Sequence, residues 1–321
     1  MYRHFLQSEA WESFEKSLGA ETFREKSEDF EFFAIKKATK LGSYLFVPYG
    51  PALKTSKSDS TLAEKSLETA LESLKALAKR ERCFFIRLEP TVALNPEFLR
   101  QKGFIKTHDH DPARTWLLDL TPDKETLLHN FSQGTRTRHN QFTKKHLELE
   151  VSHNPENIKH LVRLQRALAK EKGITAYDES YLKAELAQPF ASLYLVHFKD
   201  PETNKDQIIA ASLFFDDQEN STRYYMQSAA ASEYKKLPAT VGLLTSSLFD
   251  AKEKGLKYLD FWGIAPDDAE KTHPWAGFTR FKQSFGGFAK DCSGTWDYVL
   301  NKPKYTLYKG LREINKKIKR L

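Results

Sequence analysis

Cysteine is nearly absent from this chain of 321 residues, which has only Cys83 and Cys292. Neither has a second cysteine nearby, so the Cys-x-x-Cys spacing of zinc ribbons and redox motifs does not occur, and a disulfide scaffold is disfavoured. Long apolar runs are also missing, since no stretch reaches the roughly 18 residues of a membrane span. The first residues, MYRHFLQSEAW, lack the apolar core of a signal peptide. These absences predict a cytoplasmic protein.

The common phosphate-binding loops are missing as well. Neither Gly-x-x-x-x-Gly-Lys-Ser/Thr nor Gly-x-Gly-x-x-Gly occurs, which leaves ATP- or NAD-dependent chemistry without support. The Gly-x-Ser-x-Gly turn of serine hydrolases is also absent. A His-Asp-His-Asp run at residues 108–111 has metal-ligand side chains, but alternate residues of one loop rarely converge on an ion without further ligands. We therefore favour a solvated loop there and expect no metal and no cofactor.

What the chain does contain is enough apolar surface for two domains of ordinary size. Its residues are 40% hydrophobic and 13% aromatic, and its length exceeds that at which one core usually stops growing. The formal net charge is +7, and the pI is about 9.1. That charge fits a solvated surface as well as a polyanionic partner such as RNA, a nucleotide sugar or an acidic lipid headgroup. The net charge alone does not distinguish a solvated surface from any of these partners.

Hydrophobic periodicity predicts two α/β units. In the first, residues 1–150, amphipathic helices are expected around Trp11 to Leu18 and over 61–80, with strands at 32–37, 43–51, 83–90 and 115–120. In the second, residues 151–302, a helix around 158–168 and one after Pro238 accompany strands at 192–198, 207–215, 222–228, 257–263 and 295–300. Residues 303–321 form a last helix whose apolar stripe we expect to pack against the protein, a basic face on a membrane or RNA being the alternative.

Residues 258–297 have the composition of a site loop. A strand there leads into a polar loop, then Thr-Arg-Phe-Lys at 279–282, a glycine pair and a second strand. A lysine inside such a segment can place a fixed cation beside a developing oxyanion. By residue type alone, Lys282 could equally be an ordinary surface lysine.

Long motifs in this segment resemble the Fem family of peptidoglycan-bridge aminoacyltransferases. They read LDFWGI at 259–264, HPWAGFTRFKQSFGG at 273–287 and GTWD at 294–297. Further pieces follow in the family's order: FLQSEAWESF, VPYGP, IRLEP, RTWLLDL and RTRHNQFTKKHLELEV. The resemblance implies an α+β fold of two tandem acetyltransferase-like (GNAT) domains, with mixed, largely antiparallel sheets flanked by helices. The C-terminal helix would complete the first domain, and no coiled-coil arm is present.

The resemblance also implies site residues. Lys282 would stabilise the tetrahedral intermediate, and Phe281 would line the same channel. The acceptor peptide would be held by Thr175, Tyr177, Tyr181, Tyr225, Gln227 and Arg280. Two of these depart from the family, because Tyr177 stands where small relatives have arginine and Gln227 stands where they have tyrosine. Ser13 replaces a lysine that contacts the nucleotide precursor in some relatives, and Glu89 is either a proton acceptor or a structural partner of Arg87.

The implied reaction moves an amino acid from aminoacyl-tRNA to a side-chain amine of UDP-MurNAc-pentapeptide or lipid II. An aminoacyl ester is already activated, so neither ATP nor a metal is required. The basic residues Arg136, Arg138, His139, Lys144 and Lys145 are candidates for tRNA contact, together with Lys316, Lys317, Lys319 and Arg320. A monomer with transient membrane contact is expected.

Two alternatives to this function stay open. A coenzyme-A-dependent N-acyltransferase on the same fold would need a glycine-rich turn for the pyrophosphate, but the comparable segment, ASEYKKLPAT, has no glycine. A non-catalytic module that binds RNA or an envelope precursor would bind without turnover.

Overall fold

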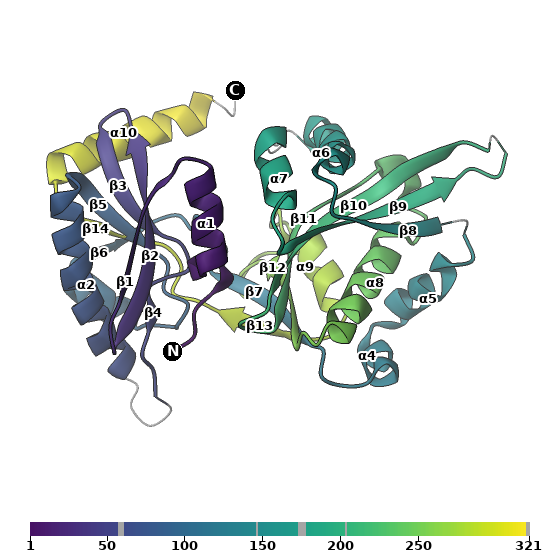
Figure 1. Ribbon diagram of the computed structural model, residues 1–321, viewed down its shortest axis with the longest axis horizontal. Coiled ribbons are helices and arrows are strands. Elements are labelled where there is room, and N and C mark those ends of the chain that lie inside the picture. Colours follow the sequence, from purple (N-terminus) through teal and green to yellow (C-terminus); the bar gives the residue numbers. More distant parts are fainter. Residues whose placement is uncertain (57–60, 146, 173–177, 203, 319–321) are drawn as a thin grey trace. The chain divides into compact units, whose positions relative to one another are not determined.

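The computed structural model describes residues 1–56, 61–145, 147–172, 178–202 and 204–318 (Figure 1). The chain divides into unit 1, residues 1–114 and 291–321, and unit 2, residues 115–290. The predicted boundaries at 150 and 302 are therefore wrong. The sequence predicts the strands at 115–120 and 295–300 correctly but assigns each to the other unit, because periodicity shows that a strand exists and not which sheet it joins.

Unit 1 contains a mixed sheet in the order β1-β2-β3-β5-β14-β6, with β4 paired to β2. Its strands are β1 (Glu21–Lys26), β2 (Phe30–Thr39), β3 (Gly42–Val47), β4 (Ala52–Leu53), β5 (Cys83–Leu88), β6 (Phe104–Lys106) and β14 (Trp296–Val299). β3 and β5 run parallel, joined by a crossover through α2 (Leu62–Arg80). As predicted, α2 buries one leucine stripe, Leu67, Leu71, Leu74 and Leu77, against the sheet.

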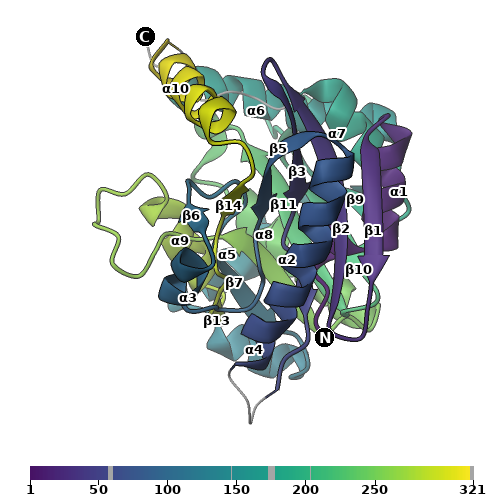
Figure 2. The ribbon, with the colours of Figure 1, turned by 90° about the vertical axis from the view of Figure 1, so that its left-hand side faces the viewer.

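The remaining helices of unit 1 are α1 (Glu9–Ser17), α3 (Pro96–Gln101) and α10 (Lys302–Ile318). Figure 2 shows α10 in yellow, and it packs on β5 of the same unit. Tyr305 is 5% exposed and contacts Phe85, while Tyr308 contacts Phe84. The described part of the predicted apolar stripe does not pack. Leu307, Leu311 and Ile314 are 54%, 39% and 54% exposed, because the tyrosine face of α10 occupies the space over the sheet.

Unit 2 is built on a second mixed sheet in the order β13-β7-β12-β11-β10-β9-β8. Its strands are β7 (Arg114–Asp119), β8 (Leu147–Ser152), β9 (Ala191–Lys199), β10 (Asp206–Asp217), β11 (Thr222–Ala230), β12 (Tyr258–Gly263) and β13 (Phe288–Asp291). β11 and β12 are parallel, whereas the pairs β7–β12, β8–β9, β9–β10 and β10–β11 are antiparallel. The helices are α4 (Lys124–Asn130), α5 (Gln133–Phe142), α6 (Ile158–Lys172), α7 (Glu179–Leu186), α8 (Ala239–Glu253) and α9 (Ala276–Gln283).

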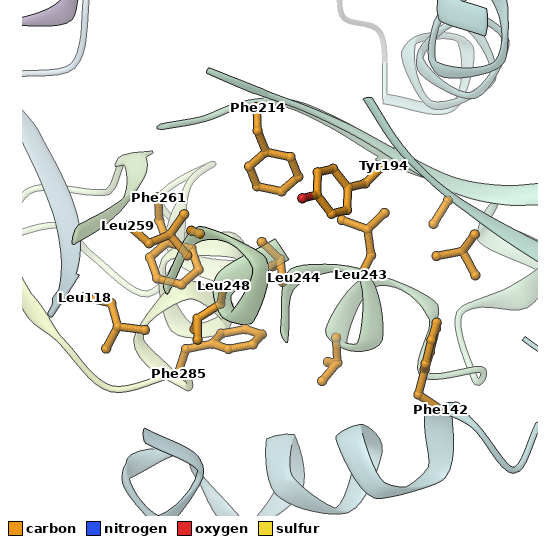
Figure 3. Packing of buried hydrophobic residues seen from close by; sticks show 14 of the residues in the cluster. Leu118, Phe142, Tyr194, Phe214, Leu243, Leu244, Leu248, Leu259, Phe261 and Phe285 are labelled. Atoms are coloured by element: carbon orange, nitrogen blue, oxygen red, sulfur yellow. The ribbon is translucent and has the colours of Figure 1, made fainter. Parts of the chain in front are cut away.

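Helix α8 forms the centre of the unit 2 core. Figure 3 shows Leu243, Leu244 and Leu248 of α8 packed between residues of the sheet, such as Phe214, and Phe142 of α5. A Cβ on Gly242 would lie 1.9 Å from the Phe142 ring, so glycine is required for this helix contact.

One buried cation anchors the sheet to α8. Arg223 is fully buried and donates to both carboxylate oxygens of Asp216, at 2.6 and 2.7 Å. It also donates to Ser247 O at 2.7 Å and to the Tyr194 hydroxyl at 2.9 Å. Strands β9, β10 and β11 are thereby fixed to α8.

Candidate active site

The two parallel strands of unit 2 diverge next to this core. Their pairing runs from Thr222↔Tyr258 to Tyr224↔Asp260, although β11 continues to Ala230. β12 bends where its register with β7 shifts, and Trp262 there adopts φ 66°. Asp260 holds the bend, because its Oδ1 accepts a hydrogen bond from Trp262 N at 2.7 Å. The divergence opens the sheet toward α9.

Helix α9 carries Lys282 into this opening. The preceding loop is fixed by Thr279, whose Oγ1 accepts a hydrogen bond from Ala265 N at 2.9 Å. Lys282 is 8% exposed, and its Nζ donates to Gly263 O at 2.5 Å and lies 5.0 Å from the ring centre of Phe278. An ammonium has three donors, and in the described part of the chain Lys282 uses one of them, so two remain for a further acceptor.

Two buried groups of opposite charge, Lys282 and Asp260, influence each other electrostatically. Burial lowers the pKa of Lys282 from 10.5 to about 8, and the charge of Asp260 opposes that shift. Burial raises the pKa of Asp260 to about 6, against the hydrogen bond from Trp262 and the nearby lysine charges. Asp260 Oδ2 also accepts from Thr115 Oγ1 at 3.2 Å. At neutral pH the site therefore holds an ammonium and a carboxylate away from water.

A cavity of about 440 Å³ lies within unit 2, and Phe281 forms part of its wall. Arg138 of α5 and the first residues of α8, from Ala239 to Val241, also line it. A helix N-terminus exposes backbone N–H groups that favour an anion. The lining residues are Arg138, Leu168, Glu171, Ile209, Ala230, Ala231, Ser232, Tyr234, Lys235, Leu237, Ala239, Thr240, Val241 and Phe281. The cavity thus combines apolar walls with a cationic, anion-accepting end.

The glycine pair of the motif has a steric cause. Gly286 and Gly287 have φ of 78° and 100°, which side chains rarely adopt. A Cβ on Gly287 would lie 2.2 Å from Leu117 O, and Trp116 Nε1 donates to Gly286 O at 2.7 Å. The pair lets the chain turn from α9 into β13 directly against β7, which fixes the position of α9.

Several predicted acceptor-binding residues lie in unit 2 without converging on Lys282. Tyr225 is half-buried against Phe214 and Phe261, and desolvation raises its pKa. Gln227 accepts a hydrogen bond from Gln165 of α6 at 3.2 Å. Tyr181 is half-buried on α7, and Arg280 is exposed on α9. Thr175 and Tyr177 lie outside the described residues.

The predicted tRNA residues have different surroundings. Arg136 donates to the carbonyl oxygens of His129 and Phe131, so it fixes the end of α4. Arg138 lines the cavity, whereas Lys144 and Lys145 are exposed beyond α5. The basic residues from 316 onward lie outside the described side chains.

Glu89 belongs to unit 1 and is not a partner of Arg87, which pairs with Asp297 through two bonds of 2.8 Å. Its Oε1 accepts from Thr295 Oγ1 at 2.5 Å and from Asp111 N at 3.1 Å. Burial and the neighbouring Asp111 raise the pKa of Glu89 to about 8, so the group is largely protonated at neutral pH. Within the described part of the chain, Glu89, His110 and Asp111 are the residues close enough to hold a metal ion, with ligand atoms within 4.8 Å.

The roles of Asp260 and of the α8 N-terminus do not follow from the family motifs. Asp260 is the single acid in the apolar strand sequence YLDFWG, and an isolated acid in a strand is a readable sign of a buried partner. For the α8 N-terminus, the readable signal is Pro238, because a proline often precedes or opens a helix.

Comparison with known proteins finds related sequences. The FemAB family model matches residues 183–313, which contain β11, β12, α8 and α9. The lipid II:glycine glycyltransferase of Staphylococcus haemolyticus (strain JCSC1435) is 22% identical over 315 residues, covering 75% of each chain. This chain is similar to the FemAB family.

Solved structures of similar fold include one described as FemX. It superposes with a TM-score of 0.78 at 18% identity, covering 95% of this chain and 94% of the other. A tandem GNAT protein from the clavulanic acid biosynthesis pathway has a TM-score of 0.51 at 12% identity, covering 86% and 81%. The fold predicted for a FemAB protein, two GNAT-like units with mixed sheets, is confirmed.

Proposed function

We propose that this protein transfers an aminoacyl group from aminoacyl-tRNA to a side-chain amine of a peptidoglycan precursor peptide. The observation that carries the proposal is Lys282, a buried ammonium held beside the diverging strands of a chain similar to the FemAB family. Among the described residues it donates to Gly263 O alone, which leaves two donors for the substrate. A preorganised cation in a water-poor site stabilises a developing oxyanion more effectively than one in water.

The reaction needs few chemical groups from the protein. The neutral acceptor amine attacks the ester carbonyl carbon, and a C–N bond forms as the C–O bond to the terminal ribose breaks. The amine proton leaves with the released ribose hydroxyl, so charge and atoms balance without a cofactor. Lys282 offsets the negative charge on the carbonyl oxygen, while the walls of the cavity orient the donor.

The donor terminus would enter the cavity of unit 2. Its phosphates suit the N-terminus of α8 and the guanidinium of Arg138, and its aminoacyl end would lie toward Phe281. As acceptor we propose the lipid-linked precursor, because the curated relatives are lipid II:glycine glycyltransferases. The reaction would then take place at the cytoplasmic face of the membrane.

The test is a transfer assay with radiolabelled aminoacyl-tRNAs and purified soluble or lipid-linked precursor. We expect label on the lipid-linked precursor, lost after RNase treatment and absent with Lys282→Met protein prepared in the same way. Label from acetyl-coenzyme A and none from aminoacyl-tRNA would replace the proposal by an N-acyltransferase. Binding of tRNA or precursor without any transfer would replace it by a binding module.

A further inference from the structure

Helix α10 has two apolar faces, and only one of them packs against the rest of unit 1. The inner face is fixed, because the Tyr305 hydroxyl donates to Asp297 at 2.7 Å and Tyr308 packs on the aromatic rings of β5. The outer face presents Leu307, Leu311 and Ile314 to solvent. These residues are spaced four and three apart, so they form one continuous stripe along the helix.

Charge is concentrated on the same segment. Residues 302–321 contain eight basic side chains and one acidic side chain, Glu313. The other 42 basic and 42 acidic side chains of the protein balance, so the whole formal charge of +7 belongs to this segment. Lys302 and Lys304 are exposed at its beginning. An exposed aliphatic stripe on a strongly basic helix is the pattern of a helix that lies in a membrane interface.

We propose that α10 docks this protein on the surface of an anionic lipid bilayer, with Leu307, Leu311 and Ile314 inserted among the acyl chains. The exposed Lys302 and Lys304 then meet the anionic headgroups. None of the described helices is long and apolar enough to cross a membrane, and interfacial binding requires no such span. RNA is the less suitable partner, because phosphate contacts make no use of an aliphatic stripe.

This surface deepens the proposed function and rests on it for its purpose, because an enzyme with a lipid-linked acceptor works at a bilayer. Binding to vesicles, however, is measured without donor or acceptor. Failure of vesicle binding therefore leaves the transfer assay unaffected, and failure of transfer leaves the docking result intact.

The experiment is co-sedimentation of the full chain with vesicles of phosphatidylcholine alone or with phosphatidylglycerol. We expect binding to the anionic vesicles, weakened by salt, and reduced at least about tenfold in Leu307→Ser/Leu311→Ser/Ile314→Ser. The matched control is Ile105→Ser/Val151→Ser, which removes side chains that are 42% and 43% exposed outside α10. It should bind as the wild type does, and thermal unfolding should show all variants folded.

Reversal of the exposed charges in Lys302→Glu/Lys304→Glu should weaken binding to anionic vesicles severalfold. Three results would overturn the proposal. They are no binding of the wild type to anionic vesicles, unchanged binding of the triple serine variant, and a triple variant that loses tRNA binding or self-association instead of vesicle binding.

Discussion

Replacing Lys282 by methionine is expected to separate turnover from stability. Removing one oxyanion donor costs about a hundredfold to a thousandfold in turnover, or about 2.7–4 kcal/mol. Stability should change in the opposite direction. A pKa lowered from 10.5 to about 8 means that the buried charge costs about 3 kcal/mol at pH 7, and the lost hydrogen bond to Gly263 returns only about 1 kcal/mol of that. The variant should therefore be more stable than the wild type by about 2 kcal/mol.

The pH dependence of both quantities follows from the same pKa. Between pH 8 and 10.5 the unfolded chain holds the Lys282 proton more firmly than the folded protein, so wild-type stability rises with pH and the variant's advantage disappears. Transfer requires the charged form, so kcat/KM of the wild type should fall above pH about 8. Lys282→Arg stays charged at high pH, so its kcat/KM should not decrease above pH about 8. Its rate should be lower than that of the wild type, because a guanidinium does not place its donors as the ammonium does.

The assays are urea unfolding at pH 7 and pH 10 and single-turnover transfer across the same range. Lys271→Met, which removes an exposed lysine from the loop before α9, is the matched control and should change neither. Near-normal turnover of Lys282→Met would refute the oxyanion role. A loss of stability in that variant would refute the claim that the ammonium is costly to bury.

Three further changes test the surroundings of Lys282. Asp260→Asn should lower the Lys282 pKa further, which moves the alkaline decrease in kcat/KM to lower pH. Because the pKa of Asp260 is raised to about 6 on folding, the wild type loses stability as the pH rises from about 4 to 6. Asp260→Asn should remove this loss. Arg223→Met leaves the largely buried Asp216 without its cation and should destabilise the protein by about 3 kcal/mol in thermal unfolding. Gly287→Ala places a Cβ against a backbone carbonyl at positive φ and should lower both Tm and transfer, whereas Gly19→Ala, with positive φ and open space, should lower Tm only slightly.

The sequence could predict the elements and the identity of the central residue, because both depend on local pattern. Leucines at spacings of three and four predicted α2, and alternating or continuous apolar runs predicted β5, β9 and β10. The Thr-Arg-Phe-Lys motif identified Lys282, and the glycine pair indicated the turn after it. These features are encoded within a few residues of one another.

Only the tertiary structure decided how these pieces combine. β7 and β14 belong to the sheets opposite to those expected, since strand pairing depends on contacts between distant segments. The stripe on α10 is exposed because its tyrosine face, not its leucine face, fits the aromatic surface of β5. The pKa of Lys282 depends on burial beside Gly263 and Phe278 and on the opposing charge of Asp260, residues that lie up to 22 positions away in sequence. The sequence determined which groups are present, and packing determined which of them lie away from water, where their charge has chemical effect.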